Sequence, residues 1–192
     1  MTTHDNPINL ILASASPRRT TILKLLEVPF SVIEAKAIEE ETMINPTMPP
    51  EIMAEELALA KARAVAKKEP NPLVLGADTI VISQGQALGK PKDHKQAKTM
   101  LRQLCGTTHQ VTTGLAIVQG DKQTQVVTHC STKVTMRSYP EEDIQTYVSS
   151  GQSMDKAGAY GIQDTSFQPV QHIEGCYQNV VGLPLCTFAQ LL

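Results

Sequence analysis

The chain has 192 residues, of which 17 are Lys or Arg and 19 are Asp or Glu, so its formal net charge is −2. This balance lacks the positive excess that drives non-specific binding to nucleic acids or acidic membranes, and 4% aromatic residues leave few side chains for base stacking. Hydrophobic residues make up 41%, as in globular proteins, so we expect one domain over residues 1–192 and exclude disorder, collagen and small disulfide scaffolds.

No stretch approaches the roughly 20 consecutive apolar residues of a membrane span, and residues 1–7 lack the basic region and long apolar run of a signal peptide. We therefore expect a cytoplasmic protein that binds neither membranes nor nucleic acids. The cysteines are widely spaced without a C-x-x-C pair, which argues against a zinc site and a redox pair. We interpret as reduced and mostly buried the thiols of Cys105, Cys130, Cys176 and Cys186.

The N-terminal part is predicted to contain a strand, a turn and two helices. Residues 8–13 form an apolar run typical of a strand. Ser16 before Pro17 predicts a helix start, because serine caps free N–H groups and proline suits the first helical position. Three prolines within 45–50 indicate a loop, and a helix follows over 50–68. Its expected apolar positions are Ile52, Leu57, Ala60 and Ala64.

The central and C-terminal parts mix strands with short helices. We predict strands at 73–75 and 79–83, separated by residues 76–78, then a turn at 84–86 and a helix over 95–105 capped by Asp93. Two long strands follow at 109–118 and 123–136, joined by a hairpin at 120–121. The capping-box spacing of 138–141 predicts a helix that ends near Gly151, and strands at 170–173 and 176–181 and a helix from about Pro184 complete the chain. Hairpins and helical crossovers alternate without a regular βαβ repeat, which predicts an α/β fold with a mixed central sheet.

The turn at residues 14–19 is the first candidate site. A helix N-terminus offers N–H donors to an anion, and Arg18 and Arg19 add guanidinium groups that bind phosphate oxygens in bidentate fashion. The alternative is an ordinary capped helix whose arginines are solvated. The sequence contains neither G-x-x-x-x-G-K-[ST] nor G-x-G-x-x-G.

Asp78 is the second candidate, because it stands between two apolar β segments where a carboxylate is partly buried at a strand end. Such an acid must be paired, hydrogen-bonded or bound to a metal; the alternative is that Asp78 only caps a turn. Lys61 and Lys90 are cations that could meet a polyphosphate, although a lone lysine is usually solvated. The acidic run 39–41 is most often a solvated surface, yet carboxylates are the ligands that Mg²⁺ or Mn²⁺ takes beside phosphates.

Five motifs resemble, in order and spacing, those of the Maf family of nucleoside triphosphate pyrophosphatases. They lie at residues 11–19, 76–79, 89–91, 155–163 and 179–185. The resemblance covers nearly the whole chain. It implies an elongated fold similar to the inosine triphosphate pyrophosphatases, with a cleft between two lobes. It also implies hydrolysis of a nucleoside triphosphate to the monophosphate and pyrophosphate with a divalent cation, Mg²⁺ or Mn²⁺.

The resemblance assigns roles to individual residues. Asp78 matches the family's proton acceptor, and Glu40 best matches an acid of the metal region, so both are expected metal ligands. Positions that line the phosphate end of the substrate are matched by Ser14, Arg19, Lys61 and Lys90.

Three further positions divide the family by substrate. The subgroup acting on dTTP and UTP carries Arg, Thr and Gln, which this chain has as Arg18, Thr79 and Gln163, whereas the subgroup acting on 7-methyl-GTP carries Trp, Gln and Glu. A neutral amide complements both donor and acceptor edges of a pyrimidine, and a carboxylate suits a cationic methylated guanine. The resemblance therefore favours dTTP and UTP as substrates.

The chain departs from the family pattern at two places. The acidic segment lies one residue further from Phe30 than in close relatives, which leaves Glu39 and Glu40 as alternatives for the metal-region acid. Asp164 follows Gln163 where the family usually has glycine, which changes the loop beside the base pocket.

We expect in-line attack of a metal-activated water on the α/β phosphoanhydride of dTTP or UTP, with Asp78 as general base or orienter of that water. The activity that the resemblance implies is that of a house-cleaning nucleotide pyrophosphatase. The alternative is a nucleotide-binding regulator of septum formation without essential turnover, the role for which the family was first named. A homodimer is one arrangement that the resemblance leaves open.

Overall fold

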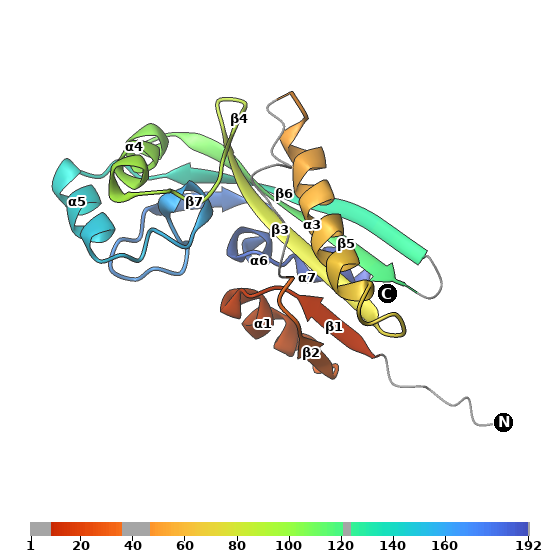
Figure 1. Cartoon of the computed structure of the whole chain (residues 1–192). Coiled ribbons are helices and arrows are strands. Elements are labelled where there is room, and N and C mark those ends of the chain that lie inside the picture. Colours follow the sequence, from red (N-terminus) through yellow and green to blue (C-terminus); the bar gives the residue numbers. More distant parts are fainter. Residues whose placement is uncertain (1–8, 36–46, 121–123, 192) are drawn as a thin grey trace.

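The computed structural model describes residues 9–35, 47–120 and 124–191. Three long strands run along an elongated molecule: β3 (Leu73–Ser83), β5 (Thr108–Gln119) and β6 (Thr124–Met136) (Figure 1). β5 pairs antiparallel with β3 and with β6, and the second pairing is the one expected for the two long β-rich runs. Of the hairpin predicted at 120–121, residue 121 lies outside the described residues, as do residues 122–123.

Four shorter strands complete one mixed sheet: β1 (Leu10–Ala13), β2 (Phe30–Val32), β4 (Gln86–Leu88) and β7 (Val170–Glu174). The order is β2-β1-β3-β5-β6-β7, and β4 pairs with β3. β1 is parallel to both β2 and β3, while the remaining pairs are antiparallel. The predicted mixed α/β sheet is therefore confirmed.

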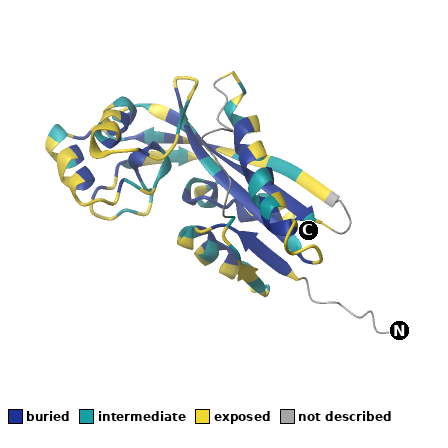
Figure 2. Cartoon of the chain, in the orientation of Figure 1, coloured by how far each residue is buried: buried dark blue, intermediate teal, exposed yellow. Residues whose placement is uncertain are grey.

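Helices cover both faces of this sheet. Successive strand residues point to opposite faces, and both faces carry apolar side chains that pack against helices. Ile11 and Val74 pack on the face covered by α3, while Leu12 and Leu75 pack on the opposite face. A separate apolar core lies at the end that carries α4 and α5 (Figures 1 and 2), which gives the expected elongated, two-lobed architecture. The helices are α1 (Pro17–Leu23), α3 (Pro50–Ala66), α4 (His94–Leu104), α5 (Glu141–Ser149), α6 (Tyr177–Val181) and α7 (Leu185–Ala189), with 3₁₀ turns η1 (Lys24–Leu26) and η2 (Ala157–Ala159).

The helix α3 lies in backbone contact with the sheet. A Cβ atom on Gly76 would stand 2.1 Å from the carbonyl oxygen of Ala58, and one on Gly114 would stand 2.2 Å from that of Ala54. Glycine therefore occurs within β3 because the helix comes close, and the predicted break at residues 76–78 is wrong: β3 is continuous.

Other predictions were wrong at helix ends and faces. Residues 177–181 form α6 and not a strand, because the Cys176 thiol accepts a capping hydrogen bond from the Asn179 amide. α5 begins after Pro140 without a side-chain cap, since Glu141 pairs with Arg102 instead of closing a capping box. Ser16 is at the N-cap of α1 but its side chain makes no capping bond.

The apolar face of α3 and the state of the cysteines also differ in part from expectation. Ile52 is exposed, because the buried face of α3 is built largely from Met53 and small alanines that approach the sheet. All four cysteines are free, as predicted, but they are not mostly buried: three are half-buried and Cys186 is exposed. The Asp93 cap of α4 is confirmed, since its carboxylate accepts from the Gln96 amide at 2.7 Å.

Candidate active site

The candidate site lies where β1 ends beside the longer β3. Ala13, the last residue of β1, is opposite Gly76, and β4 pairs with β3 only from Val81 onward. Between these points, residues 77–80 have no strand partner on that edge within the described chain. Side chains from the β1–α1 turn and from α3 converge on this open stretch.

Asp78 forms a buried ion pair there. Its carboxylate Oδ1 lies 2.5 Å from Nζ of Lys61, and the two side chains are 11% and 12% exposed respectively. Lys61 reaches Asp78 from α3, on the face to which Gly76 and Asp78 both point. A buried carboxylate requires such a partner. Asp78 lies within β3 opposite Gly114, so the alternative that it only caps a turn is wrong.

Arg19 approaches the same stretch from the opposite face. It is 9% exposed, which excludes a solvated guanidinium. Its Nε donates to the carbonyl oxygen of Gly182 at 2.8 Å, Nη1 to Ser14 Oγ at 3.2 Å, and Nη2 to Thr79 Oγ1 at 3.0 Å. Asp78 and Thr79 are consecutive, so the sheet receives one cation from each face at neighbouring residues.

Arg18 points elsewhere and is less buried. Its Nη1 donates to Oδ2 of Asp155 at 2.8 Å, and the side chains are 31% and 63% exposed. Partial burial of Asp155 opposes ionisation, but hydrogen bonds from Arg18 and Lys156 outweigh it and hold the pKa of Asp155 below its ordinary value. This ion pair connects α1 to the segment 155–164.

The segment 155–164 bridges the two lobes. Tyr160 packs in the core of the α4–α5 lobe, and Ile162 packs against the core beneath β1 and α1. The amide of Gly158 donates to the carbonyl of Gly89 at 3.0 Å, which places the exposed Lys90 beside this segment. Gln163 is exposed on it.

Two interactions fix this segment from the α4–α5 lobe. The Tyr160 hydroxyl lies 2.7 Å from Nε2 of His109, whose pKa is lowered to about 4 by burial. Asp164, the departure from the family pattern, accepts a hydrogen bond from the Tyr147 hydroxyl and lies 3.5 Å from Nζ of Lys156. The added charge is therefore compensated within the lobe.

The structure thus groups most of the predicted residues. Arg19 contacts both Ser14 and Thr79, and Lys61 contacts Asp78. Arg18 contacts Asp155, which belongs to the segment that carries Gln163. Glu39 and Glu40 lie outside the described residues.

Sequence reasoning missed other residues of the site, namely Thr113, Asp155, Asn179 and Gly182. Three of them lie within the quoted motifs, which was a usable signal, whereas Thr113 carries none.

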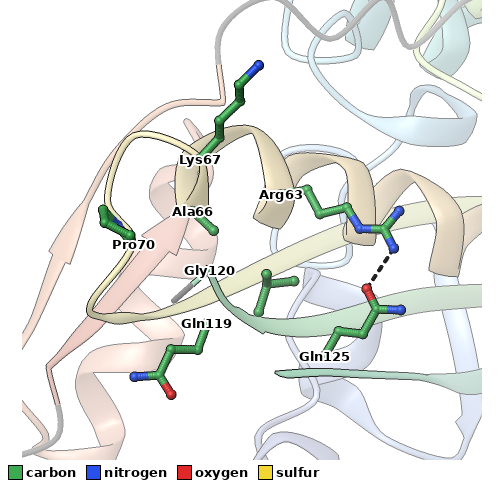
Figure 3. Close-up of a pocket in the computed structure, with 8 residues that line it drawn as sticks. Arg63, Ala66, Lys67, Pro70, Gln119, Gly120 and Gln125 are labelled. Carbon is green, nitrogen blue, oxygen red and sulfur yellow. Dashed lines mark hydrogen bonds between the residues drawn. The ribbon is translucent and has the colours of Figure 1, made fainter. Parts of the chain in front are cut away.

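A shallow depression lies at the C-terminal end of α3, where it meets the loop to β3 and the ends of β5 and β6 (Figure 3). Arg63 donates there to Gln125 at 2.6 Å, and Lys67 extends from the same helix end. None of the predicted site residues lines this depression, so the open stretch of β3 remains the candidate site.

Within the described ranges, no three His, Cys, Asp or Glu side chains form a group that could hold a metal ion. Asp78 is the one carboxylate on the open stretch of β3, residues 77–80. Mg²⁺ typically binds one or two protein carboxylates and completes its shell with water and substrate phosphates. The donor set at Asp78 fits that pattern.

No helix in the described part of the chain is long and apolar enough to cross a membrane.

The fold and site define an α/β protein with a buried carboxylate and several cations gathered at an open strand edge. Residues 9–192 match the family described as Maf-like protein, and the chain belongs to that family.

Relatives extend over almost the full length. A protein of Moorella thermoacetica named "dTTP/UTP pyrophosphatase" is 49% identical over 95% of this chain and 93% of its own. Proteins of the same name from Symbiobacterium thermophilum and Bacillus mycoides are 47% and 46% identical, each over 95% of this chain and over 92% and 93% of their own lengths. Among solved structures, a HAM1 protein from Coxiella burnetii has a TM-score of 0.49 and 13% identity, and the match covers 85% of this chain and 80% of that one.

Proposed function

We propose that this protein hydrolyses dTTP and UTP to the monophosphate and pyrophosphate. The observation that carries the proposal is that Lys61 and Arg19 bind consecutive residues, Asp78 and Thr79, at the open edge of β3. The names of the relatives support the same activity and substrates. The cytoplasm is the location we propose.

The cations suit the phosphate end of the substrate. Arg19 is fixed by three internal hydrogen bonds, so its guanidinium is oriented before an anion arrives. Lys61 and Lys90 add positive charge from α3 and from the loop after β4. Fixed positive groups offset the charge that develops on a departing pyrophosphate without reorganising.

Asp78 is the group suited to act on the attacking water. Its carboxylate oxygens accept hydrogen bonds, so it orients a water molecule and takes its proton as the water attacks the α-phosphorus. Lys61 compensates the charge of the buried carboxylate and holds it at the strand edge. Mg²⁺ or Mn²⁺, which we propose to bind at Asp78 and Glu40, supplies a lowered pKa of bound water and charge compensation on the phosphates.

The base end is expected at Arg18 and Gln163. Both belong to the unit formed by α1 and the segment 155–164, which the Arg18–Asp155 pair connects. An amide at Gln163 donates to a pyrimidine carbonyl and accepts from a ring N–H. Thr79 belongs to the same predicted set, but its hydroxyl contacts Arg19.

The test is product analysis with wild-type protein and Asp78→Asn. Wild type is expected to release pyrophosphate from dTTP and UTP, and chelation of divalent ions is expected to stop the release. Asp78→Asn keeps the side-chain shape and is expected to lower the rate by about 10²–10⁴-fold, as for loss of a positioned base. Orthophosphate as first product, or unchanged kinetics in the variant, would contradict the proposal; nucleotide binding without turnover would favour the regulator.

A further inference from the structure

A chain of two hydroxyl groups, from the half-buried Thr79 and the buried Thr113, extends from Arg19 into the sheet. Nη2 of Arg19 lies 3.0 Å from Thr79 Oγ1, which lies 2.9 Å from Thr113 Oγ1 on the neighbouring strand β5. Thr113 Oγ1 lies 3.0 Å from the carbonyl oxygen of Asn179 in α6. Thr113 and Asn179 are completely buried. The chain exists because the register of β3 and β5 places Thr79 directly opposite Thr113.

The direction of these hydrogen bonds follows from counting protons. A carbonyl oxygen only accepts, so the single hydroxyl proton of Thr113 goes to Asn179. Thr113 must then accept the proton of Thr79, and Thr79 in turn accepts from Arg19, whose guanidinium only donates. The proton of Thr79 is therefore used inside the protein, and it is not available to a nucleobase in this arrangement.

The helix α6 therefore holds Arg19 by two routes. The carbonyl of Gly182, directly after α6, accepts from Nε at 2.8 Å, and the carbonyl of Asn179 acts on Nη2 through the two threonines. Asn179 is itself fixed, since its side-chain amide donates to the Val111 carbonyl and to Thr132 Oγ1, each at 2.9 Å. A guanidinium anchored at both edges has one orientation.

We propose that Thr113 is a positioning residue for the phosphate-side cation Arg19, acting through Thr79, and that Thr79 serves Arg19 instead of contacting the base. This inference rests on the proposed function, because it assigns Arg19 to the phosphate end of the substrate. Thr113 touches no substrate in this scheme. Its hydroxyl oxygen accepts the proton of Thr79, so the oxygen of Thr79 is oriented to accept the hydrogen bond from Arg19.

The decisive variant is Thr113→Val, which keeps the shape and removes the hydroxyl. Its matched control is Thr112→Val on the same strand. Thr112 is equally buried, but its hydroxyl lies 2.8 Å from Ser131 Oγ, and as the adjacent strand residue it points to the other face. Both variants lose one buried hydroxyl, so both report the cost of that loss to stability, whereas only Thr113→Val interrupts the chain to Arg19.

We expect Thr113→Val to lower kcat about 10- to 100-fold, with a smaller change in KM, as for loss of a group that orients a catalytic-site residue. Thr112→Val is expected to keep the wild-type kcat below its melting temperature. Thr113→Ser restores the hydroxyl and is expected to restore kcat. If Thr113→Val does not fold, Thr113→Cys replaces it, because a thiol is only a weak donor.

Binding of inorganic pyrophosphate by titration calorimetry provides a readout without turnover. We expect weaker pyrophosphate binding in Thr113→Val than in wild type, Thr112→Val and Thr113→Ser. If the wild type binds pyrophosphate but hydrolyses neither dTTP nor UTP, the proposed function fails, while weaker binding in Thr113→Val still supports the inference. Equal kcat and equal pyrophosphate affinity in Thr113→Val and Thr112→Val would overturn it.

Discussion

Protonation of His109 is expected to destabilise the protein in mildly acidic solution. The imidazole is 4% exposed, and burial lowers its pKa from the ordinary 6.5 to about 4. Its Nε2 lies beside the Tyr160 hydroxyl, while Nδ1 has no hydrogen-bond partner in the part of the chain that the structure describes. A protonated ring carries N–H donors at both nitrogens, so Nδ1–H would be buried without an acceptor.

The magnitude follows from the two pKa values of His109. Between about pH 6.5 and pH 4 the unfolded chain binds the proton and the folded chain does not, so the free energy of unfolding falls as pH falls. Each pH unit is worth about 1.4 kcal/mol. The full loss is therefore roughly 3 kcal/mol, of which about 2 kcal/mol falls between pH 7 and pH 5. Above the unfolded-state pKa neither state is protonated, and the contribution is constant.

Urea unfolding at neutral pH and at about pH 5 measures this contribution. In His109→Gln the amide can still bond to the Tyr160 hydroxyl but does not titrate, so its loss of stability over that interval is expected to be smaller than that of wild type by about 2 kcal/mol. His172→Gln removes an exposed imidazole and is the matched control. Equal pH dependence in His109→Gln and wild type would refute the reasoning.

Three further predictions concern the site. Asp155→Asn is expected to change stability by less than about 1 kcal/mol, because its ion pair with Arg18 is exposed, but to raise KM for dTTP and UTP, measured by steady-state kinetics. Gln163→Glu is expected to lower kcat/KM for dTTP and UTP relative to CTP and 7-methyl-GTP, by a factor that corresponds to about 1–3 kcal/mol of activation free energy if the lost donor is buried by substrate; unchanged ratios would place Gln163 away from the base. Gly182→Ala introduces a Cβ at φ +126°, 3.4 Å from Thr79 Oγ1, and is expected to lower the free energy of unfolding by about 1–3 kcal/mol in denaturation experiments.

The sequence predicted best the elements that carry their own local signals. The Asp93 cap and Gly106 mark the two ends of α4, and the two long β-rich runs formed β5 and β6. Gly76 was misread because a glycine marks either a turn or a close approach of another backbone, and only the position of α3 decides between them. The strand predicted at 176–181 became α6 because the β propensity of two valines is a weak signal, and the capping hydrogen bond at Cys176 favours a helix.

The residues of the candidate site that could be predicted are those whose residue type and sequence neighbours indicate their chemistry. Arg19 stood out as a guanidinium at a helix N-terminus, and Asp78 as a partly buried carboxylate that requires a partner. The structure supplies partners for both. Thr113 could not be found in this way, since one threonine in a β-strand looks like any other. Its importance arises from the register that sets it against Thr79, which is a property of the sheet.

The backbone contact between α3 and the sheet has a consequence for reading mutational surveys. Because Gly76 and Gly114 have no Cβ atom, α3 can pack closely against β3 and β5. Lys61 lies about one helical turn after Ala58, whose carbonyl oxygen nearly touches Gly76. A side chain at either glycine would move the helix, and with it the ammonium group that reaches Asp78. In a screen scored only by activity, these two positions would be indistinguishable from catalytic residues, and a parallel screen for protein abundance would be needed to tell them apart.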